Sequence, residues 1–218
     1  GVARALRAAK SKALLHTDAV QGFMKEPFSA KTLGADMISV SGHKVHAPKG
    51  IGALYIRQGL KLPAHILGGG QEEGLRSGTE PMPQIAAFGE AVRIAKAEMP
   101  EANKRMEALR AQCVQTLADT VPGIVFLGGG SAHILSLSLP GYRSEVLMNY
   151  LEAKGIYVSK SSACKRGKRS HVLEAIDAPD KVIDGALRVS FSRYTTAEEC
   201  AYFCEALAAA RKELYPSL

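Results

Sequence analysis

The stretch ISVSGHKVHAPKGIGALYI, residues 38–56, contains two short apolar runs separated by a polar turn. The first run ends at Ser41, and His43 and Lys44 follow it almost directly. Proline and glycine then precede a second apolar run over residues 50–56. Apolar runs bounded by turn residues predict buried strands. The pattern therefore places a lysine amine where a buried strand ends. This position is typical of a residue that binds a ligand or takes part in catalysis.

The whole chain has the composition of an ordinary globular protein. Its 218 residues are 46% hydrophobic and 22% charged, which suits one large domain or two modest ones. No apolar run approaches the roughly 20 residues of a membrane-spanning helix, and the first residues lack the apolar centre of a secretory signal. The net charge of +7 permits an acidic partner, but no nucleic-acid-binding motif accompanies it. We expect a cytoplasmic protein that binds neither membrane nor nucleic acid.

The four cysteines show no paired CxxC spacing, so neither a zinc site nor a disulfide framework is indicated. Reduced cysteines are expected, and no metal site is predicted. Cys113, Cys200 and Cys204 fall in expected helices and are interpreted as packing residues. Cys164 instead lies in a polar loop.

Strands alternate with helices along the chain, which predicts α/β architecture. In the first half we expect a helix ending at Gly34 and a helix longer than usual, which Pro100 is expected to kink or break. The other expected elements are strands over 13–21, 37–42 and 50–56, a glycine-rich loop over 67–83, and the long helix over about 84–119.

The second half has a different pattern of polar and apolar residues. It begins with an alternation of the two over 133–141, which predicts a half-buried strand. Ser144 is expected to cap a helix that stops at Gly155. Thr195 or Thr196 is expected to cap a terminal helix from about 196 to 214. We place the domain boundary in the long helix, which gives domains 1–115 and 116–218.

Polar groups follow the first strands at the points where those strands end. Asp18 ends the first strand, and Lys44 follows the second with Ser41 and His43 beside it. Ligands of open α/β sheets bind at the carboxyl ends of the strands. A lysine held partly dry there loses its proton more easily and can form a Schiff base. Each residue alone is more often a turn former or a solvated group. The combination favours an aldehyde cofactor such as pyridoxal 5'-phosphate.

Five motifs carry a family resemblance: LLHTDAVQ, SVSGHKVHAPKGIGALYI, GGGQEEGLRSGTE, SSAC and ALRVSFSRYTT. In this order they resemble the cysteine desulfurases of the NifS/IscS type, in the class V aminotransferase group of pyridoxal-phosphate enzymes. The resemblance implies a partial fold-type I transferase. It comprises the C-terminal part of the large mixed-sheet cofactor domain and a small α+β C-terminal domain, because the family's chains extend further at the N-terminus.

The resemblance also implies how the cofactor is held. Lys44 is the lysine that links covalently to pyridoxal phosphate. Asp18 pairs with the pyridine nitrogen, and Gln21 contacts the ring oxygen. Ser41 and His43 bind the phosphate.

Three further residues receive roles from the same resemblance. Thr79 reaches the phosphate of a neighbouring subunit, which implies a homodimer. Arg188 grips the substrate carboxylate. Cys164 takes sulfur from L-cysteine, leaving L-alanine and an enzyme persulfide. Lys165 and Arg166 directly follow it, and nearby cations favour a thiolate.

The predicted function is therefore that of a cysteine desulfurase, or of a C-terminal fragment of one. It would pass sulfur to an acceptor or scaffold protein for iron–sulfur cluster or thio-cofactor assembly. Selenocysteine lyase and class V aminotransferase are alternatives with the same fold, and a non-catalytic fragment or assembly subunit is a third. Lys160 and Glu73 depart from the family pattern, and the short chain is expected to be inactive alone or to depend on a partner.

Overall fold

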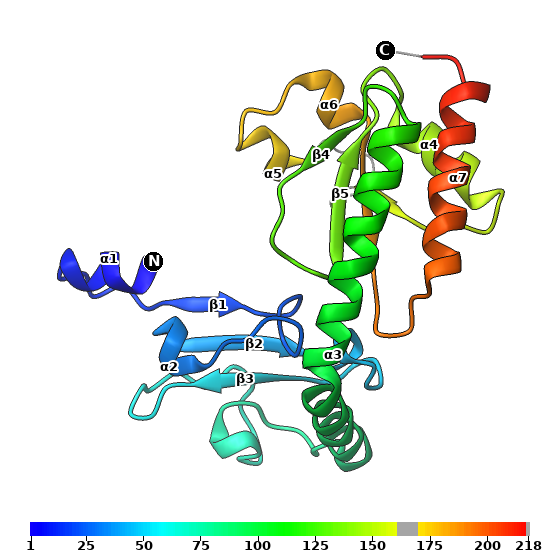
Figure 1. Ribbon diagram of the computed structural model, residues 1–218. Helices are drawn as coiled ribbons and strands as arrows, with labels where there is room; N and C mark the ends of the chain where they lie inside the picture. The colour runs from blue at the N-terminus through cyan, green and yellow to red at the C-terminus, as the bar shows by residue number, and fades with distance from the viewer. Residues whose placement is uncertain (161–169, 217–218) are drawn as a thin grey trace. The chain divides into compact units, whose positions relative to one another are not determined.

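The computed structural model describes residues 1–160 and 170–216 and divides into two compact units (Figure 1). Unit 1 is Gly1–Met99 and unit 2 is Pro100–Leu218. The division lies inside α3 (Met82–Thr120), one helix that continues through Pro100. Of the expected kink or break, the break is wrong, because a proline inside a helix removes only one backbone donor and neighbouring turns can hold the helix together. The kink stays a prediction. The boundary predicted at 115/116 lies in the same helix, and the role of each domain stays a prediction.

Unit 1 contains a three-stranded mixed sheet in the order β1-β2-β3. β1 runs parallel to β2, and β3 runs antiparallel to it. The first strand is shorter than expected because only its central three residues pair with β2. The strands are β1 (His16–Asp18), β2 (Met37–Ser41) and β3 (Gly52–Ile56).

Short helices and turns connect these strands. The second helix ends at Gly34 as predicted, with a φ of 63° that glycine adopts without strain. Its partly buried Leu33 packs against a small core of Ala19, Ala35 and Ile38. Besides the first part of α3, the helical elements of unit 1 are α1 (Val2–Ala8), α2 (Ala30–Leu33), η1 (Gly42–Val45) and η2 (Glu72–Gly74).

Asp36 ties all three strands together at the edge of the sheet where β2 begins. Its Oδ2 accepts a hydrogen bond from the Leu15 amide at 2.8 Å, just before β1. Its Oδ1 accepts one from Arg57 Nε at 2.7 Å, just after β3. Both hydrogen bonds favour the ionised carboxylate, and they lower the pKa of Asp36. The candidate site lies at the opposite side of the sheet, at the carboxyl ends of β1 and β2.

Unit 2 contains a four-stranded sheet in the order β4-β5-β7-β6, in which every paired strand is antiparallel. β5 alternates as predicted from its sequence, and Leu135 and Leu137 are buried while Ile134 and Ser136 are half-buried. The strands are β4 (Val125–Leu127), β5 (Ile134–Ser138), β6 (Ser159–Lys160) and β7 (Ala186–Ser190).

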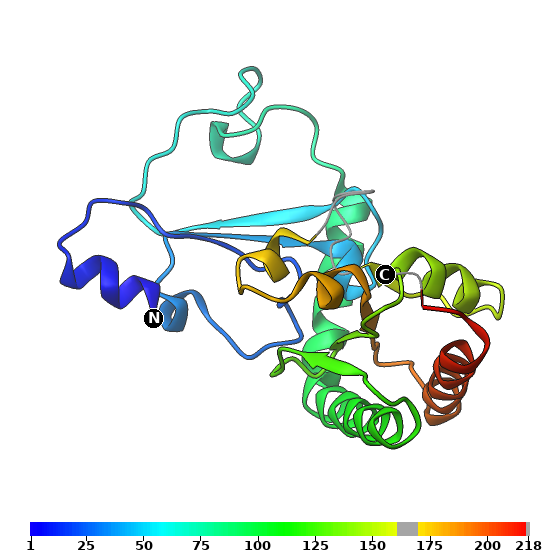
Figure 2. The same cartoon turned by 90° about the horizontal axis from the view of Figure 1, so that it is seen from above.

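Three helices cover this sheet and enclose the main core. The last helix lies beside α4 and the second half of α3 in both views (Figures 1 and 2). The core contains Leu117 of α3, Leu147 of α4, Leu187 of β7 and Leu207 of α7, each fully buried. The remaining helices of unit 2 are α4 (Ser144–Glu152), α5 (His171–Glu174), α6 (Asp180–Asp184) and α7 (Ala197–Glu213).

The helix ends of unit 2 bear out one predicted cap and contradict another. Thr196 caps α7 and forms a reciprocal capping box with Glu199, as expected. Ser144 does not cap α4, because Arg143 holds the cap position and the Ser144 hydroxyl donates to the Glu145 carboxylate instead. Over the two described ranges, the helices lack the long apolar stretch that crossing a membrane requires.

Candidate active site

Lys44 lies in η1, the turn that directly follows β2, as its sequence predicted. Its side chain is half-buried, and the neighbouring Gly42 and Val45 are buried. The turn is tied to the start of β3 because the Gly42 amide donates to the Ile51 carbonyl at 2.9 Å. A Cβ at Gly42 would stand 2.7 Å from Ile51 Cγ2, so only glycine fits there. Close packing of these two segments therefore fixes the position of the amine.

Ser41 and His43 form a hydrogen-bonded pair on the same turn. The Ser41 hydroxyl and His43 Nδ1 are 2.8 Å apart. Ser41 is the last residue of β2, and His43 is exposed. A hydroxyl and an imidazole held together at a strand end offer hydrogen-bond donors to an anion. This arrangement fits the phosphate group of the predicted cofactor.

Asp18 reaches the same edge of the sheet from the neighbouring strand. It is the last residue of β1, which pairs in parallel with β2 so that Asp18 is opposite Ser39. Asp18 Oδ1 accepts a hydrogen bond from the Val20 amide at 3.0 Å, and this orients the exposed carboxylate. Gln21 follows in an exposed turn. The parallel pairing thus brings the predicted acid and the predicted amine to one edge of one sheet.

Lys25 is a member of this edge that the sequence pattern did not reveal. It lies in the turns after β1, and burial followed by the positive charge of Lys44 lowers the pKa of its amine. The positive charge of Lys44 thus acts on a second, partly buried amine of unit 1. Its only sequence signal is its position seven residues after Asp18, which says nothing about burial.

Thr79 lies in a loop of unit 1. It is exposed in the loop between η2 and α3. The loop itself is ordered by side chains: the Gly78 amide donates to Gln71 Oε1 at 3.1 Å. Within the described residues, no hydrogen bond joins Thr79 to the pair. Its assignment to a neighbouring subunit stays a prediction.

Arg188 belongs to unit 2, on the central strand β7. It is opposite Ser136 of β5 and Ser159 of β6, and its side chain is half-buried. Its Nε atom is buried and has no hydrogen-bond partner in the part of the chain that the structure describes. A buried guanidinium donor without a partner is costly. The atom is suited to an anionic ligand such as a carboxylate.

Cys164 lies outside the described residues, in the segment 161–169, and its role stays a prediction. The strand before this segment ends in Lys160, whose ammonium forms an ion pair with the Glu145 carboxylate of α4. The hydrogen bond that Lys160 donates in this ion pair is the main cause of the lowered pKa of Glu145. The unusual lysine thus anchors β6 to α4.

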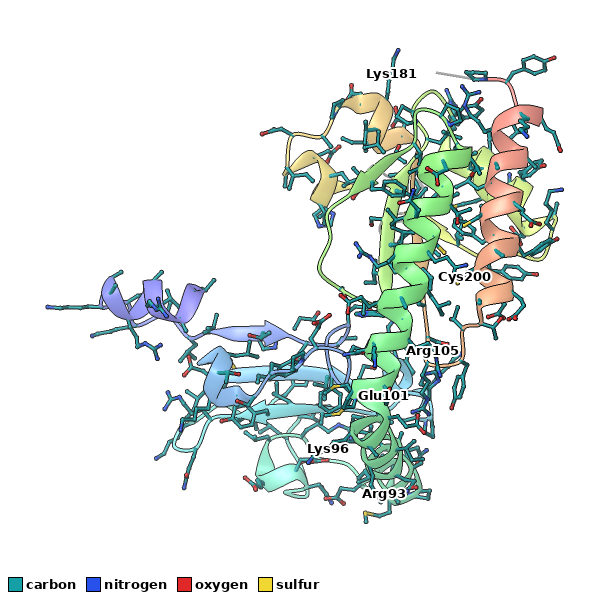
Figure 3. The ribbon with its side chains drawn as sticks, viewed as in Figure 1. Arg93, Lys96, Glu101, Arg105, Lys181 and Cys200 are labelled. Atoms are coloured by element: carbon teal, nitrogen blue, oxygen red, sulfur yellow. The ribbon has the colours of Figure 1, made fainter. Side chains whose placement is uncertain are left out.

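The other three cysteines are buried, as predicted for packing residues: Cys113 in α3, and Cys200 and Cys204 in α7. Figure 3 labels Cys200 on α7. Burial is the largest cause that raises the pKa of Cys200, to about 12. Cys204 Sγ lies 4.0 Å from the Cys113 carbonyl oxygen. The Cys200 thiol therefore stays protonated and unreactive at neutral pH. All three cysteines are packing residues, as their sequence positions predicted.

Comparison with known proteins gives a consistent result. The family model described as Aminotransferase class-V matches residues 2–203. The chain is 40% identical over 199 residues to Cysteine desulfurase 2 of Trichormus variabilis, covering 89% of this chain and 50% of that protein. It is 42% identical to Cysteine desulfurase IscS of Tolumonas auensis, covering 88% of this chain and 48% of that protein.

A solved structure named NIFS-LIKE PROTEIN superimposes with a TM-score of 0.89 at 38% identity. The match covers 98% of this chain and 56% of that one. The chain thus spans about half the length of the curated relatives it matches. These similarities confirm the resemblance and the partial α/β fold, and the chain belongs to the class V aminotransferase family.

Proposed function

We propose that this chain is the part of a cysteine desulfurase that holds the cofactor-linking lysine and the substrate arginine. The supporting observation is the edge of the unit 1 sheet, where Lys44 follows the hydrogen-bonded Ser41–His43 pair on the strand next to Asp18. This set supplies an amine, anion-binding donors and a carboxylate, which pyridoxal phosphate requires. When bound, the cofactor supplies an electron sink for carbanion chemistry at the substrate.

The residues of this chain have separate tasks in the proposal. Asp18 holds the proton of the ring nitrogen, with Gln21 near the ring oxygen, and Ser41 and His43 hold the phosphate. Lys44 moves protons at the substrate carbon.

The remaining tasks concern the substrate and its sulfur. Arg188 orients the carboxylate of L-cysteine. The Cys164 thiolate attacks the substrate sulfur, so that a carbon–sulfur bond breaks and a sulfur–sulfur bond forms. The carbon takes up a proton, and the products are L-alanine and the Cys164 persulfide.

The persulfide would be passed to an acceptor or scaffold protein for iron–sulfur cluster or thio-cofactor assembly. The relative in Tolumonas auensis carries the name IscS, which supports this assignment. We further propose a cytoplasmic homodimer in which Thr79 completes the phosphate site of the neighbouring subunit. Its position in an exposed loop agrees with such a role.

A transamination reaction on the same fold is the second candidate, because the matching family model is described as Aminotransferase class-V. Transamination and desulfuration share the lysine and the aspartate but differ in their need for a thiol. Cys164 therefore separates the two functions.

The first test follows cofactor capture by the purified chain. Added pyridoxal phosphate is expected to give the absorbance of a lysine-linked cofactor, which Lys44→Ala removes. Lys49→Ala is the matched control, because Lys49 is an exposed lysine just beyond the same turn, and it is expected to keep the absorbance. A folded sample without this absorbance contradicts the cofactor assignment and favours a non-catalytic subunit.

The second test measures L-alanine and sulfide formed from L-cysteine in the presence of a thiol, with the chain supplemented by the half of Trichormus variabilis Cysteine desulfurase 2 that it does not match. Cys164→Ala is expected to retain cofactor capture and to lose more than about 100-fold in alanine formation, since it removes the attacking group. Full-rate sulfide release by this variant rules out the desulfurase assignment.

A further inference from the structure

Lys160 is a charged residue on a very short strand of the unit 2 sheet. The strand β6 consists of Ser159 and Lys160, and in the described residues it pairs with β7 alone. Each backbone hydrogen bond adds little net stability, so two paired residues hold a strand weakly. An edge strand of this length therefore depends on further contacts to keep its position.

The ion pair of Lys160 supplies such a contact from one face of the sheet. Lys160 is opposite Leu187 of β7, and residues opposite each other on paired strands point to the same face. Leu187 is fully buried in the core that α4 helps to enclose, so Lys160 lies on that face too. There its ammonium pairs with the Glu145 carboxylate in the first turn of α4.

The Glu145 carboxylate is itself held by a second hydrogen bond. The Ser144 hydroxyl donates to Glu145 Oε2 at 3.3 Å, while the Lys160 ammonium donates to Oε1. Ser144 is fully buried, and Leu147 in the next turn of α4 packs into the main core. The Lys160 side chain is only 26% exposed, so solvent screens this pair less than a fully exposed one. The ion pair thus ties β6 to a helix end that the core holds in place.

Arg188 lies on the opposite face of the same two strands. It is opposite Ser159, the neighbour of Lys160, and neighbouring strand residues point to opposite faces. Side chains opposite each other on paired strands have Cβ atoms about 5 Å apart. Ser159 therefore flanks the Arg188 side chain on one side, as Ser136 of β5 does on the other. A shift of β6 moves one of these two neighbours of Arg188.

The orientation of the Arg188 guanidinium depends on this packing. Its Nε atom is buried and has no hydrogen-bond partner in the part of the chain that the structure describes. That atom is therefore positioned by the side chains around it and not by a hydrogen bond. A guanidinium free to take several orientations binds a carboxylate less tightly, because binding must then restrict it to one.

We propose that Glu145 and Lys160 are positioning residues for Arg188. Their ion pair holds β6 against β7 and thereby keeps the guanidinium in the orientation that receives the substrate carboxylate. Neither residue touches the substrate. This role rests on the proposed function, because that function supplies the carboxylate, but the effect on Arg188 exists without substrate or cofactor.

The first experiment measures the accessibility of Arg188 in the purified chain. Phenylglyoxal, a reagent that modifies arginine side chains, is added, and peptide mass spectrometry gives the rate at Arg188. Lys160→Met removes the ammonium and keeps an unbranched side chain. Because β6 then loses its tie to α4, modification of Arg188 is expected to be about five times faster, and Glu145→Gln is expected to act in the same way. Arg105, an exposed arginine of α3, is the internal reference (Figure 3).

Two further variants serve as the rescue and the matched control. Lys160→Arg keeps a cation that can pair with Glu145, and it is expected to return the rate at Arg188 to within about twofold of the native value. Lys181→Met removes an exposed lysine of α6 in the same unit, and it is expected to leave the rate unchanged (Figure 3). Far-ultraviolet circular dichroism checks that all variants fold.

The second experiment measures the kinetics of alanine formation in the supplemented assay of the proposed function. Lys160→Met is expected to raise the KM for L-cysteine about fivefold and to leave kcat within about twofold of the native value. This division is expected because the ion pair acts on the residue that binds the carboxylate, whereas Lys44 and Cys164 stay in place. A pair that only stabilised the fold would not produce it.

Three outcomes overturn the proposal. One is an unchanged rate at Arg188 in folded Lys160→Met and Glu145→Gln. The second is an equal acceleration by Lys181→Met, or no rescue by Lys160→Arg. The third is an unchanged KM in Lys160→Met. If the native supplemented chain forms no alanine, the proposed function fails, and the rate at Arg188 alone decides whether the ion pair positions this residue.

Discussion

In unit 2, β5 lies between β4 and β7, and its Leu137 is 0% exposed. In unit 1, β3 lies at the edge of its sheet, and its Leu54 is 50% exposed. Both strands have five residues and similar apolar content. They differ in what covers them: helices α3, α4 and α7 enclose the first, and the second faces a cavity.

The difference between the strands reflects a difference between the units: the larger core lies in one unit, and the cofactor-site residues lie in the other. The extensive core lies in unit 2, but Lys44, Asp18, Ser41 and His43 all lie in unit 1. Hydrogen bonds and one close glycine contact position these residues, with little help from buried apolar area. Polar positioning of this kind is sensitive to local change and adds little to global stability.

The largest effect is expected from truncating the enclosed strand. Leu137→Ala should lower the free energy of unfolding of unit 2 by about 3 kcal/mol, because it leaves a cavity in a closed core. Leu54→Ala should cost about 1 kcal/mol or less, because half of that side chain is already in water. Denaturant unfolding followed by circular dichroism measures both. Equal losses would show that β3 is as well covered as β5.

A smaller effect is expected at the glycine that holds the lysine turn. Gly42→Ala should destabilise unit 1 by roughly 1–3 kcal/mol, because the added methyl overlaps Ile51. Faster hydrogen exchange over residues 38–56 measures the disturbance. Gly89→Ala is the control, since a methyl at Gly89 in α3 meets no atom within 4 Å and should stabilise the helix by up to about 1 kcal/mol. If Gly42→Ala left the stability of unit 1 unchanged, the backbone of this turn would be able to shift enough to accommodate the added methyl.

The smallest effect is expected in acid, at the opposite edge of the same sheet. Hydrogen bonds from Leu15 and Arg57 lower the pKa of Asp36, so its ionised form stabilises the fold above the ordinary carboxyl pKa of about 4. That contribution is lost as the pH falls through the lowered pKa. Asp36→Asn should therefore be less stable than the native chain at pH 7, with the difference shrinking below about pH 4. Thermal unfolding across this range checks it, and a constant difference would contradict the assignment.

Much of the secondary structure could be predicted from local patterns. The long helix was expected over 84–119 and spans Met82–Thr120, because apolar residues recur at helical spacing along it. The position of Lys44 after the second strand also followed from turn residues. Ser144 was assigned wrongly as a cap, because serine can occupy the first helical position as well as the cap. The short helix α6 was missed between Pro179 and Gly185, which read as loop residues.

The site was only partly predictable. The placement of Asp18 and Lys44 at one edge followed from strand order, but the nearness of Lys25 depends on tertiary packing that no spacing encodes. The ion pair of Lys160 with Glu145 likewise joins residues from different elements. The unpartnered Nε of Arg188 became visible only from its burial.

The hydrogen bonds of Asp36 have a consequence for the order of folding. Asp36 is 21 residues from Leu15 and 21 residues from Arg57, so each bond closes a short loop at little cost in chain entropy. The sheet of unit 2 pairs β4 with the nearby β5, but it is completed only when Ser136 pairs with Arg188, which lies much further along the chain. As the chain leaves the ribosome, the strands that carry the candidate site are expected to assemble first, before the residues that build the larger core have been synthesised.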